Sequence, residues 1–170
     1  MIVGYVAGGS LVLVIMPSLI YLLTSLLDSL VSIEIIPNPT FKWIGIILLL
    51  VAGFGFGLSS VVIQNTKGEG GPLEIGSIEI SPKTKNLVVS GPYKYTRNPM
   101  LFGTLLIYLA YALFLNSIFA VVLVASLFVF MLSVVVKMEE KRLAQDFGAP
   151  YEEYRKKVSR FIPWFHRKLK

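Results

Sequence analysis

The chain has 170 residues, of which 55% are hydrophobic and 15% charged, and its mean hydropathy is +0.72. One soluble domain of this size cannot bury so much apolar surface, whereas uncharged runs longer than about 18 residues can cross a bilayer. The formal net charge of +6 comes from Lys and Arg clustered at the ends of apolar runs, which indicates a membrane protein and argues against a nucleic-acid partner. With no Cys and with His166 as the single His, we expect no metal site.

Four apolar runs are expected to be membrane-spanning helices, in an integral membrane protein surrounded by the bilayer. These runs are Ile2–Leu27, Trp43–Ile63, Met100–Leu115 and Ile118–Val136. Pro17 is expected to kink the first span. We expect this span to be retained, because it lacks the basic start and short apolar core of a cleaved signal peptide.

Proline and glycine residues organise the second span and the connector before it. The connector runs from Asp28 to Lys42, and Pro39 within it argues against an unbroken helix there. Gly53 and Gly57 are spaced for close contact with another helix. With Gly55 they resemble part of a nucleotide-binding fingerprint, but no strand precedes them, so helix packing is the favoured interpretation.

The longest polar connector covers Asn65 to Asn86. Within it, the alternating segments 73–75 and 78–80 flank Gly76 and Ser77, which predicts a small β-hairpin with Gly at the first turn position. An irregular loop is the alternative. A hairpin would lay its apolar face on the membrane or on the active site.

The two last spans and the basic residues predict the topology. Only Asn116 and Ser117 join these spans, which forces an antiparallel helical hairpin. Apart from Lys42, every Lys and Arg lies between residues 67 and 97 or after Val136. Four spans bring both basic regions to one side, which the positive-inside rule places in the cytosol together with both termini.

Apolar residues after the fourth span recur at steps of three or four, which predicts one apolar helical face. They are Leu143, Phe147, Tyr151, Tyr154, Val158 and Phe161. Gly148 and Pro150 are expected to divide this stretch into two helices, the second beginning with acidic and ending with basic residues. We expect an amphipathic cap against the bundle or the lipid interface.

The sequence therefore predicts an all-α membrane protein with about four transmembrane helices, a helical hairpin core and a C-terminal amphipathic cytosolic cap. In this single integral domain, residues 1–64 would form an N-terminal helix pair and residues 65–170 the functional half. The segment 87–103 is the one polar, basic and turn-rich stretch set between very apolar ones. It is where we expect the chemistry.

Asn98 and Pro99 predict a helix start in this segment, because Asn is a favoured N-cap and Pro is favoured at the first helical position. The free N–H groups of that helix, with Lys94 and Arg97 beside them, would hold an anionic group. From the residues alone, a capped transmembrane helix with basic flanks is an equally good interpretation.

Several short motifs follow one another in the second half of the chain. They are Gly91-Pro92-Tyr93, Arg97-Asn98-Pro99-Met100-Leu101-Phe102-Gly103, the helical hairpin, Glu139-Glu140, Phe147-Gly148 and Tyr151-Glu152-Glu153-Tyr154. Through them, over residues 83–163, the chain resembles the isoprenylcysteine carboxyl methyltransferase family and the related phospholipid N-methyltransferases. The resemblance implies an integral membrane methyltransferase whose S-adenosylmethionine enters from the cytosol and whose lipid-like or prenylated acceptor enters from the bilayer.

The resemblance also implies site residues, carried over by position. Those expected to bind the cofactor are Lys85, Asn86, Leu87, Val88, Tyr93, Arg97, Asn98, Pro99, Met100, Leu101, Gly103 and Glu139. Glu140 or Tyr93 would assist an amine acceptor that must lose a proton, and Arg160 would help to orient the acceptor. The alternative for Glu139 and Glu140 is a solvated ion pair with Arg142.

Three residues depart from the family pattern. Asn98 stands where the longer signature has His, and Leu101 stands where it has Tyr. Val135 occupies the position at which the isoprenylcysteine enzymes have an Arg for the substrate carboxylate, and Lys137 or Arg160 would have to replace it. The sequence therefore leaves three interpretations: an isoprenylcysteine-type O-methyltransferase, a phosphatidylethanolamine-type N-methyltransferase, and a non-catalytic membrane subunit with a degenerate cofactor site.

Overall fold

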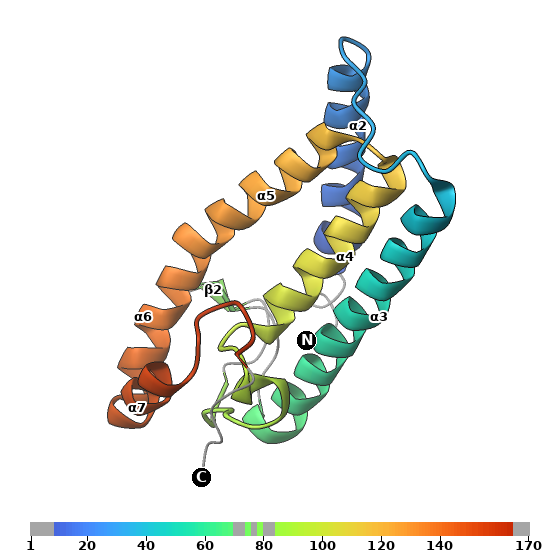
Figure 1. Ribbon diagram of the computed structural model, residues 1–170. Helices are drawn as coiled ribbons and strands as arrows, with labels where there is room; N and C mark the ends of the chain where they lie inside the picture. The colour runs from blue at the N-terminus through green and yellow to red at the C-terminus, as the bar shows by residue number, and fades with distance from the viewer. Residues whose placement is uncertain (1–8, 70–73, 76–77, 80–83, 165–170) are drawn as a thin grey trace.

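The computed structural model describes residues 9–69, 74–75, 78–79 and 84–164. In this part of the chain the regular secondary structure is helical apart from one two-stranded ribbon, which confirms the predicted all-α membrane fold (Figure 1). The helices are η1 (Leu11–Ile15), α2 (Met16–Asp28), α3 (Pro39–Ile63), η2 (Gln64–Gly68), η3 (Gly91–Lys94), α4 (Pro99–Leu115), α5 (Ile118–Ser133), α6 (Val135–Phe147) and α7 (Ala149–Lys157). The start of the predicted first span and the Gly76-Ser77 turn lie outside the described residues.

The described residues contain three helical segments that are long and apolar enough to cross a membrane. They are residues 11–28, 39–68 and 118–147. The remaining apolar helix, α4, has 17 residues, and at 1.5 Å per residue it is about 26 Å long, close to the hydrocarbon thickness of a bilayer. α4 packs against both α3 and α5. The protein is an integral membrane protein.

Two of these segments contain π-helical turns. η1 ends two residues before Pro17, whose missing N–H removes a bond from the regular helical ladder. This irregularity lies where the kink was expected. The second π-helical turn, η2, ends α3.

Helix α3 begins four residues before its predicted start at Trp43. The side-chain oxygen of Asn38 accepts hydrogen bonds from the backbone N–H groups of Thr40 (2.9 Å) and Phe41 (3.3 Å), and Pro39 lies in the first turn. No unbroken helix runs from Asp28 to Lys42, as Pro39 predicted, because α2 ends at Asp28 and α3 starts only at Pro39. The predicted end of the connector at Lys42 is wrong, because a proline in the first turn of a helix gives up an N–H that has no helical partner.

Helices α3 and α4 cross in close backbone contact. A Cβ added to Gly103 of α4 would lie 2.6 Å from the carbonyl oxygen of Gly53 and 2.6 Å from the nitrogen of Gly57. Helix packing at Gly53 and Gly57 is thereby confirmed. A Cβ on Gly55, by contrast, would meet no atom within 4 Å.

Helices α4 and α5 form the predicted antiparallel hairpin. Asn116 has a left-handed backbone conformation (φ 53°), and the Ser117 hydroxyl accepts a hydrogen bond from the N–H of Phe119 at 3.2 Å. Where α2 meets this hairpin the buried core consists of Ile20, Tyr108, Ala112, Ala120, Val124 and Phe128.

The predicted β-hairpin is confirmed in its pairing. Strands β1 (Glu74–Ile75) and β2 (Ile78–Glu79) are antiparallel, with Glu74 opposite Glu79 and Ile75 opposite Ile78. β1 contacts α6. The hairpin therefore belongs to the end of the bundle at which the C-terminal helices lie.

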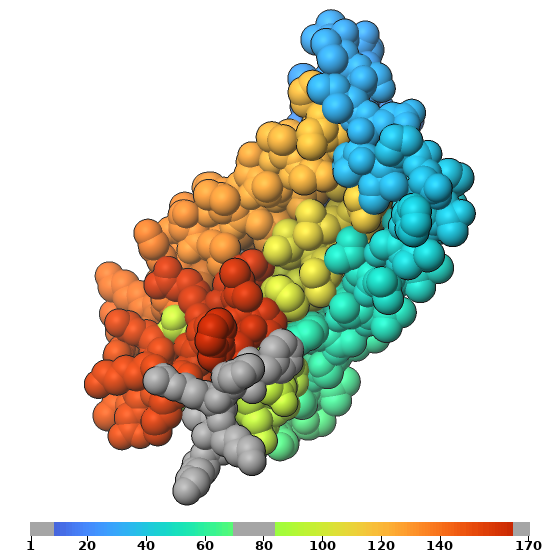
Figure 2. All heavy atoms as spheres, in the orientation of Figure 1, coloured from blue at the N-terminus to red at the C-terminus, as the bar shows by residue number. Residues whose placement is uncertain are grey.

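The C-terminal cap lies against the bundle. Gly148 (φ 55°) separates α6 from α7, as predicted. The buried residues of the cap, Tyr151, Tyr154 and Val158, pack against Leu87, Leu143, Ala144 and Phe147. After α7, residues 158–164, here called the strap, run beside residues 95–98. In the space-filling view the red atoms of α7 and the strap lie between α6 and α4 (Figure 2).

Candidate active site

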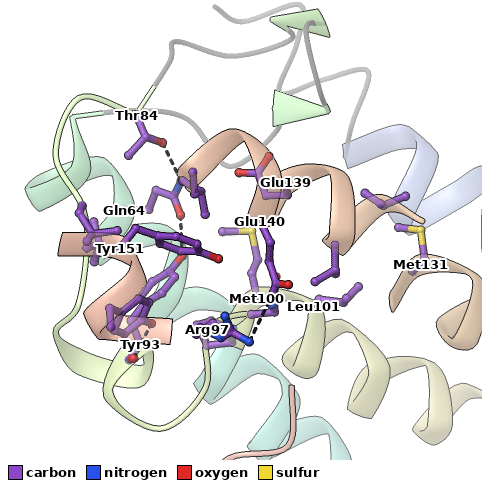
Figure 3. Close-up of a pocket in the computed structure, with 18 of the residues that line it drawn as sticks. Gln64, Thr84, Tyr93, Arg97, Met100, Leu101, Met131, Glu139, Glu140 and Tyr151 are labelled. Atoms are coloured by element: carbon purple, nitrogen blue, oxygen red, sulfur yellow. Dashed lines mark hydrogen bonds and ion pairs between the residues drawn. The ribbon is translucent and has the colours of Figure 1, made fainter. Parts of the chain in front are cut away.

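A cavity of about 290 Å³ lies between α6, α7 and the segment that precedes α4 (Figure 3). Nine of the twelve residues expected to bind the cofactor line it: Leu87, Val88, Tyr93, Arg97, Asn98, Pro99, Met100, Leu101 and Glu139. Glu140 and Tyr151 line it as well. The fold therefore brings together residues from both halves of the resemblance.

Glu140 lies between two guanidinium groups. Nη2 of Arg97 is 2.9 Å from its Oε1, while Nε and Nη2 of Arg160 are 3.1 Å from Oε1 and 2.8 Å from Oε2. The side chains of Arg97 and Glu140 are only 8% and 9% exposed, and that of Arg160 is 46% exposed. Both carboxylate oxygens of Glu140 are therefore occupied by charge-assisted hydrogen bonds.

Arg97 and Tyr151 present polar atoms without partners. Nε and Nη1 of Arg97 and the hydroxyl of Tyr151 are buried and have no hydrogen-bond partner among the described residues. Burial raises the pKa of the Tyr151 hydroxyl, and the Glu140 carboxylate raises it further, while the guanidinium of Arg97, which lies next to this hydroxyl, lowers it. Leaving a buried polar group unpaired costs about 1–3 kcal/mol. Such groups in the wall of a cavity indicate a ligand that supplies hydrogen-bond acceptors.

Glu139 lines the cavity and also forms an ion pair on its own helix. Its Oε1 is 2.5 Å from Nη2 of Arg142, and its Oε2 accepts a hydrogen bond from Nε at 3.1 Å. Its side chain is 26% exposed. The ion pair with Arg142 that was the alternative interpretation is present, and the same carboxylate lies at the cavity wall.

Tyr93 is held as a proton donor. Its hydroxyl donates to Oε1 of Gln64 at 2.5 Å, and Nε2 of Gln64 donates to the hydroxyl of Thr84 at 3.1 Å. Burial raises the pKa of the Tyr93 hydroxyl, and Glu139 raises it further. At neutral pH Tyr93 is therefore protonated, which does not suit the role of proton acceptor expected from the sequence.

The comparison with known protein families shows to which family the chain belongs. Residues 42–150 match the family model described as phospholipid methyltransferase (PEMT). The chain belongs to the phospholipid methyltransferase family. No curated protein and no solved structure shows significant similarity to it. The protein is an integral membrane methyltransferase, and the resemblance to this group of membrane enzymes is confirmed.

Four predicted site residues lie outside the cavity of this methyltransferase. Lys85 pairs with Glu69 on the surface at 3.4 Å, and the side chain of Asn86 donates to a backbone carbonyl at 3.3 Å. Gly103 lies in the contact between α3 and α4. Arg160 does not line the cavity, and its side chain bonds to Glu140, which does.

Asn98 begins α4 without capping it through its side chain. Its Nδ2 donates to the carbonyl oxygen of Arg160 at 2.8 Å, and its side chain makes no capping hydrogen bond. The helix still starts at Pro99, as predicted, but the predicted side-chain cap is wrong because the strap binds that side chain. Lys94, expected to lie beside Arg97 at an anion site, is exposed and does not line the cavity.

The sequence analysis missed further residues of the methyltransferase cavity. Gln64 lies on the π-helical turn η2, a type of irregularity that is frequent at functional sites. Its place as the first polar residue after a long apolar run was an available signal. The other unassigned residues include Val12, Thr84, Thr104, Met131, Val136 and Leu143. These come from five separate segments, so no local pattern connects them.

Proposed function

We propose that this methyltransferase uses S-adenosylmethionine to methylate the amine headgroup of a phosphatidylethanolamine-type lipid. The observation that carries the proposal is the set of three buried donor atoms without partners among the described residues, two on Arg97 and one on Tyr151, in the wall of a largely apolar cavity. This arrangement suits one ligand with a charged end and a second ligand with an apolar body.

The cavity has the groups that the cofactor requires. The free Nε and Nη1 of Arg97 and the hydroxyl of Tyr151 suit its carboxylate. The carboxylates of Glu139 and Glu140 suit its ammonium and sulfonium groups, because a partly buried site screens such charges less than water does. When bound, the cofactor supplies an electrophilic methyl group.

The charges of the cavity favour an amine as the acceptor. Among the described residues that line it, Arg97 is the one cation, and Val135 stands where an acceptor carboxylate would need another. A prenylcysteine carboxylate would therefore compete with the cofactor for Arg97. An ethanolamine amine and the cationic groups of the cofactor do not have to share a single partner, because two carboxylates, Glu139 and Glu140, line the cavity. The family match favours the same class of acceptor.

The remaining roles are the positioning of the acceptor and the removal of its proton. The apolar walls exclude water and position the acceptor for in-line attack. The side chain of Glu140 is only 9% exposed and is paired with two guanidinium groups, and Tyr93 holds its proton, so neither is the group that receives the amine proton. We assign this to Glu139, whose carboxylate is exposed enough to pass a proton to water.

Cofactor binding is tested with purified protein in detergent. S-adenosylhomocysteine should raise the temperature of unfolding, because a ligand that binds only the folded state stabilises it by mass action. If millimolar S-adenosylhomocysteine gives neither a thermal shift nor calorimetric heat, the protein is the non-catalytic subunit and the proposal fails.

The acceptor is tested with S-adenosylmethionine carrying a labelled methyl group. Phosphatidylethanolamine and a farnesylcysteine analogue are offered side by side, and label is expected in the phospholipid fraction. Label in the farnesylcysteine analogue alone would establish the isoprenylcysteine-type reaction instead. Label only in a water-soluble product would contradict both lipid acceptors.

A further inference from the structure

We propose that Arg160, on the strap, is a positioning residue that keeps two donors of Arg97 free for the cofactor carboxylate. The inference rests on the proposed function, since it needs a carboxylate to bind at Arg97. It assigns a role in cofactor binding to the strap, although none of residues 158–164 lines the cavity.

The side-chain geometry shows what Arg160 does to Glu140. A carboxylate and a guanidinium in contact tend to form two parallel hydrogen bonds. Here Arg97 forms one contact with Oε1 of Glu140, while Nη2 of Arg160 occupies Oε2 at 2.8 Å. Because Arg160 forms the two-bond pair with Glu140, through Nε to Oε1 and Nη2 to Oε2, Arg97 is left with its single contact at Oε1. Nε and Nη1 of Arg97 remain buried and without a partner among the described residues.

The backbone fixes Arg160 relative to Arg97. The N–H of Arg97 donates to the carbonyl oxygen of Ser159 at 2.9 Å. The hydroxyl of Thr96 and the side-chain amide of Asn98 both donate to the carbonyl oxygen of Arg160, at 3.3 Å and 2.8 Å. Thr96 is fully buried. The strap is thus bonded to the residues on both sides of Arg97, and Asn98 serves the strap instead of the helix cap.

The charge of Arg160, like its geometry, favours the binding of a carboxylate at Arg97. Arg97, Glu140 and Arg160 together carry one net positive charge, which favours a bound carboxylate. Without Arg160, the buried pair of Arg97 and Glu140 is neutral. The free Oε2 can then accept a hydrogen bond from Arg97 that the cofactor would otherwise receive. Loss of Arg160 therefore weakens the binding of a ligand carboxylate by two routes.

The test compares two nucleosides in the full-length protein. S-adenosylhomocysteine carries the carboxylate, whereas 5′-methylthioadenosine has the same nucleoside without the amino acid part. In Arg160→Ala, affinity for S-adenosylhomocysteine should fall about tenfold or more, and affinity for 5′-methylthioadenosine should not change. Arg160→Lys should recover most of the loss, because a lysine can still occupy Oε2. Arg160→Gln provides the same comparison if Arg160→Ala does not fold.

Arg155→Ala is the matched control. It removes the same charge from an exposed pair with Glu152 (3.3 Å) and should leave both affinities near those of the parent. Unchanged binding of S-adenosylhomocysteine in Arg160→Ala, or an equal loss for both nucleosides, would overturn the inference and leave the proposed function standing. A parent protein that binds S-adenosylhomocysteine no more tightly than 5′-methylthioadenosine would instead refute the carboxylate site at Arg97 itself.

Discussion

Replacing Gly103 by alanine separates two roles for this residue. The family resemblance implies a contact with the cofactor, whereas the structure places Gly103 between α3 and α4. An added Cβ would lie 2.6 Å from the carbonyl oxygen of Gly53 and 2.6 Å from the nitrogen of Gly57. Both are backbone atoms, so no side-chain rotation relieves the overlap and the two helices must move apart.

The size of the effect follows from two opposing terms. Overpacking a tight contact costs about 1–3 kcal/mol, and the upper part of that range applies where backbone is displaced. Alanine regains about 0.5–1 kcal/mol over glycine within a helix. We therefore expect Gly103→Ala to lower the free energy of unfolding by about 1–2 kcal/mol. Gly55→Ala adds the same methyl group to α3 where no atom lies within 4 Å, and should keep or slightly raise stability.

The assay is the thermal midpoint of each variant in one detergent, followed by the dissociation constant for S-adenosylhomocysteine at a temperature where all variants are folded. Gly103→Ala should unfold about 2–8 °C below the parent and bind the ligand within about twofold of it. A midpoint equal to that of the parent would refute the packing argument. Weakened binding in a variant as stable as the parent would instead show that Gly103 contacts the cofactor.

Three further predictions concern the site, the topology and the pH dependence of stability. Glu139→Gln should weaken S-adenosylhomocysteine binding about tenfold by removing a carboxylate from the cavity wall, while Glu153→Gln on the exposed face of α7 should not; equal affinities in the two variants would contradict the assignment. Cysteines introduced singly at Leu30, which is 80% exposed, and at Lys157 should react from opposite sides of the membrane, with Lys157 in the cytosol; labelling of both from one side would contradict the topology. Burial raises the pKa of the Tyr154 hydroxyl, so above about pH 10 the unfolded chain loses that proton before the folded chain does, and the free energy of unfolding falls by about 1.4 kcal/mol per pH unit for such a group. The thermal midpoint of Tyr154→Phe should therefore fall less steeply between pH 10 and 11 than that of the parent. Equal slopes would show that this hydroxyl is not buried.

The architecture could be predicted because its signals are local. Long uncharged runs predict the membrane-spanning helices, and the Asn116-Ser117 junction is too short for anything but a helical hairpin. Gly148 marks the end of α6, where the backbone adopts φ 55°. The close approach of α3 and α4 was visible as small residues at Gly53 and Gly57, but their partner Gly103 was not, because one helix does not specify its neighbour.

The two Asn-Pro pairs show where local signals end. Both begin a helix at the proline, α3 at Pro39 and α4 at Pro99. Only Asn38 caps its helix with its side chain, since Asn98 gives its side-chain amide to the carbonyl of Arg160. The dipeptide therefore predicts the start of the helix in both places, while a partner distant in sequence decides what the asparagine side chain does.

The adjacent carboxylates of α6, Glu139 and Glu140, show the same difference between local and distant contacts within the site. Successive residues on a helix point about 100° apart, so Glu139 and Glu140 have different partners although both line the cavity. The sequence predicts the partner of Glu139, because Arg142 lies one turn away on the same helix at a spacing that supports ion pairs. It does not predict the partners of Glu140, because Arg97 and Arg160 reach it only after the bundle has closed and the strap has paired with the residues around Arg97. The residue on which the cofactor carboxylate is proposed to depend is thus controlled by contacts made across the fold. This is why the resemblance could place Arg97 and Glu140 in one site, while the bonds that leave two donors of Arg97 free had to come from the structure.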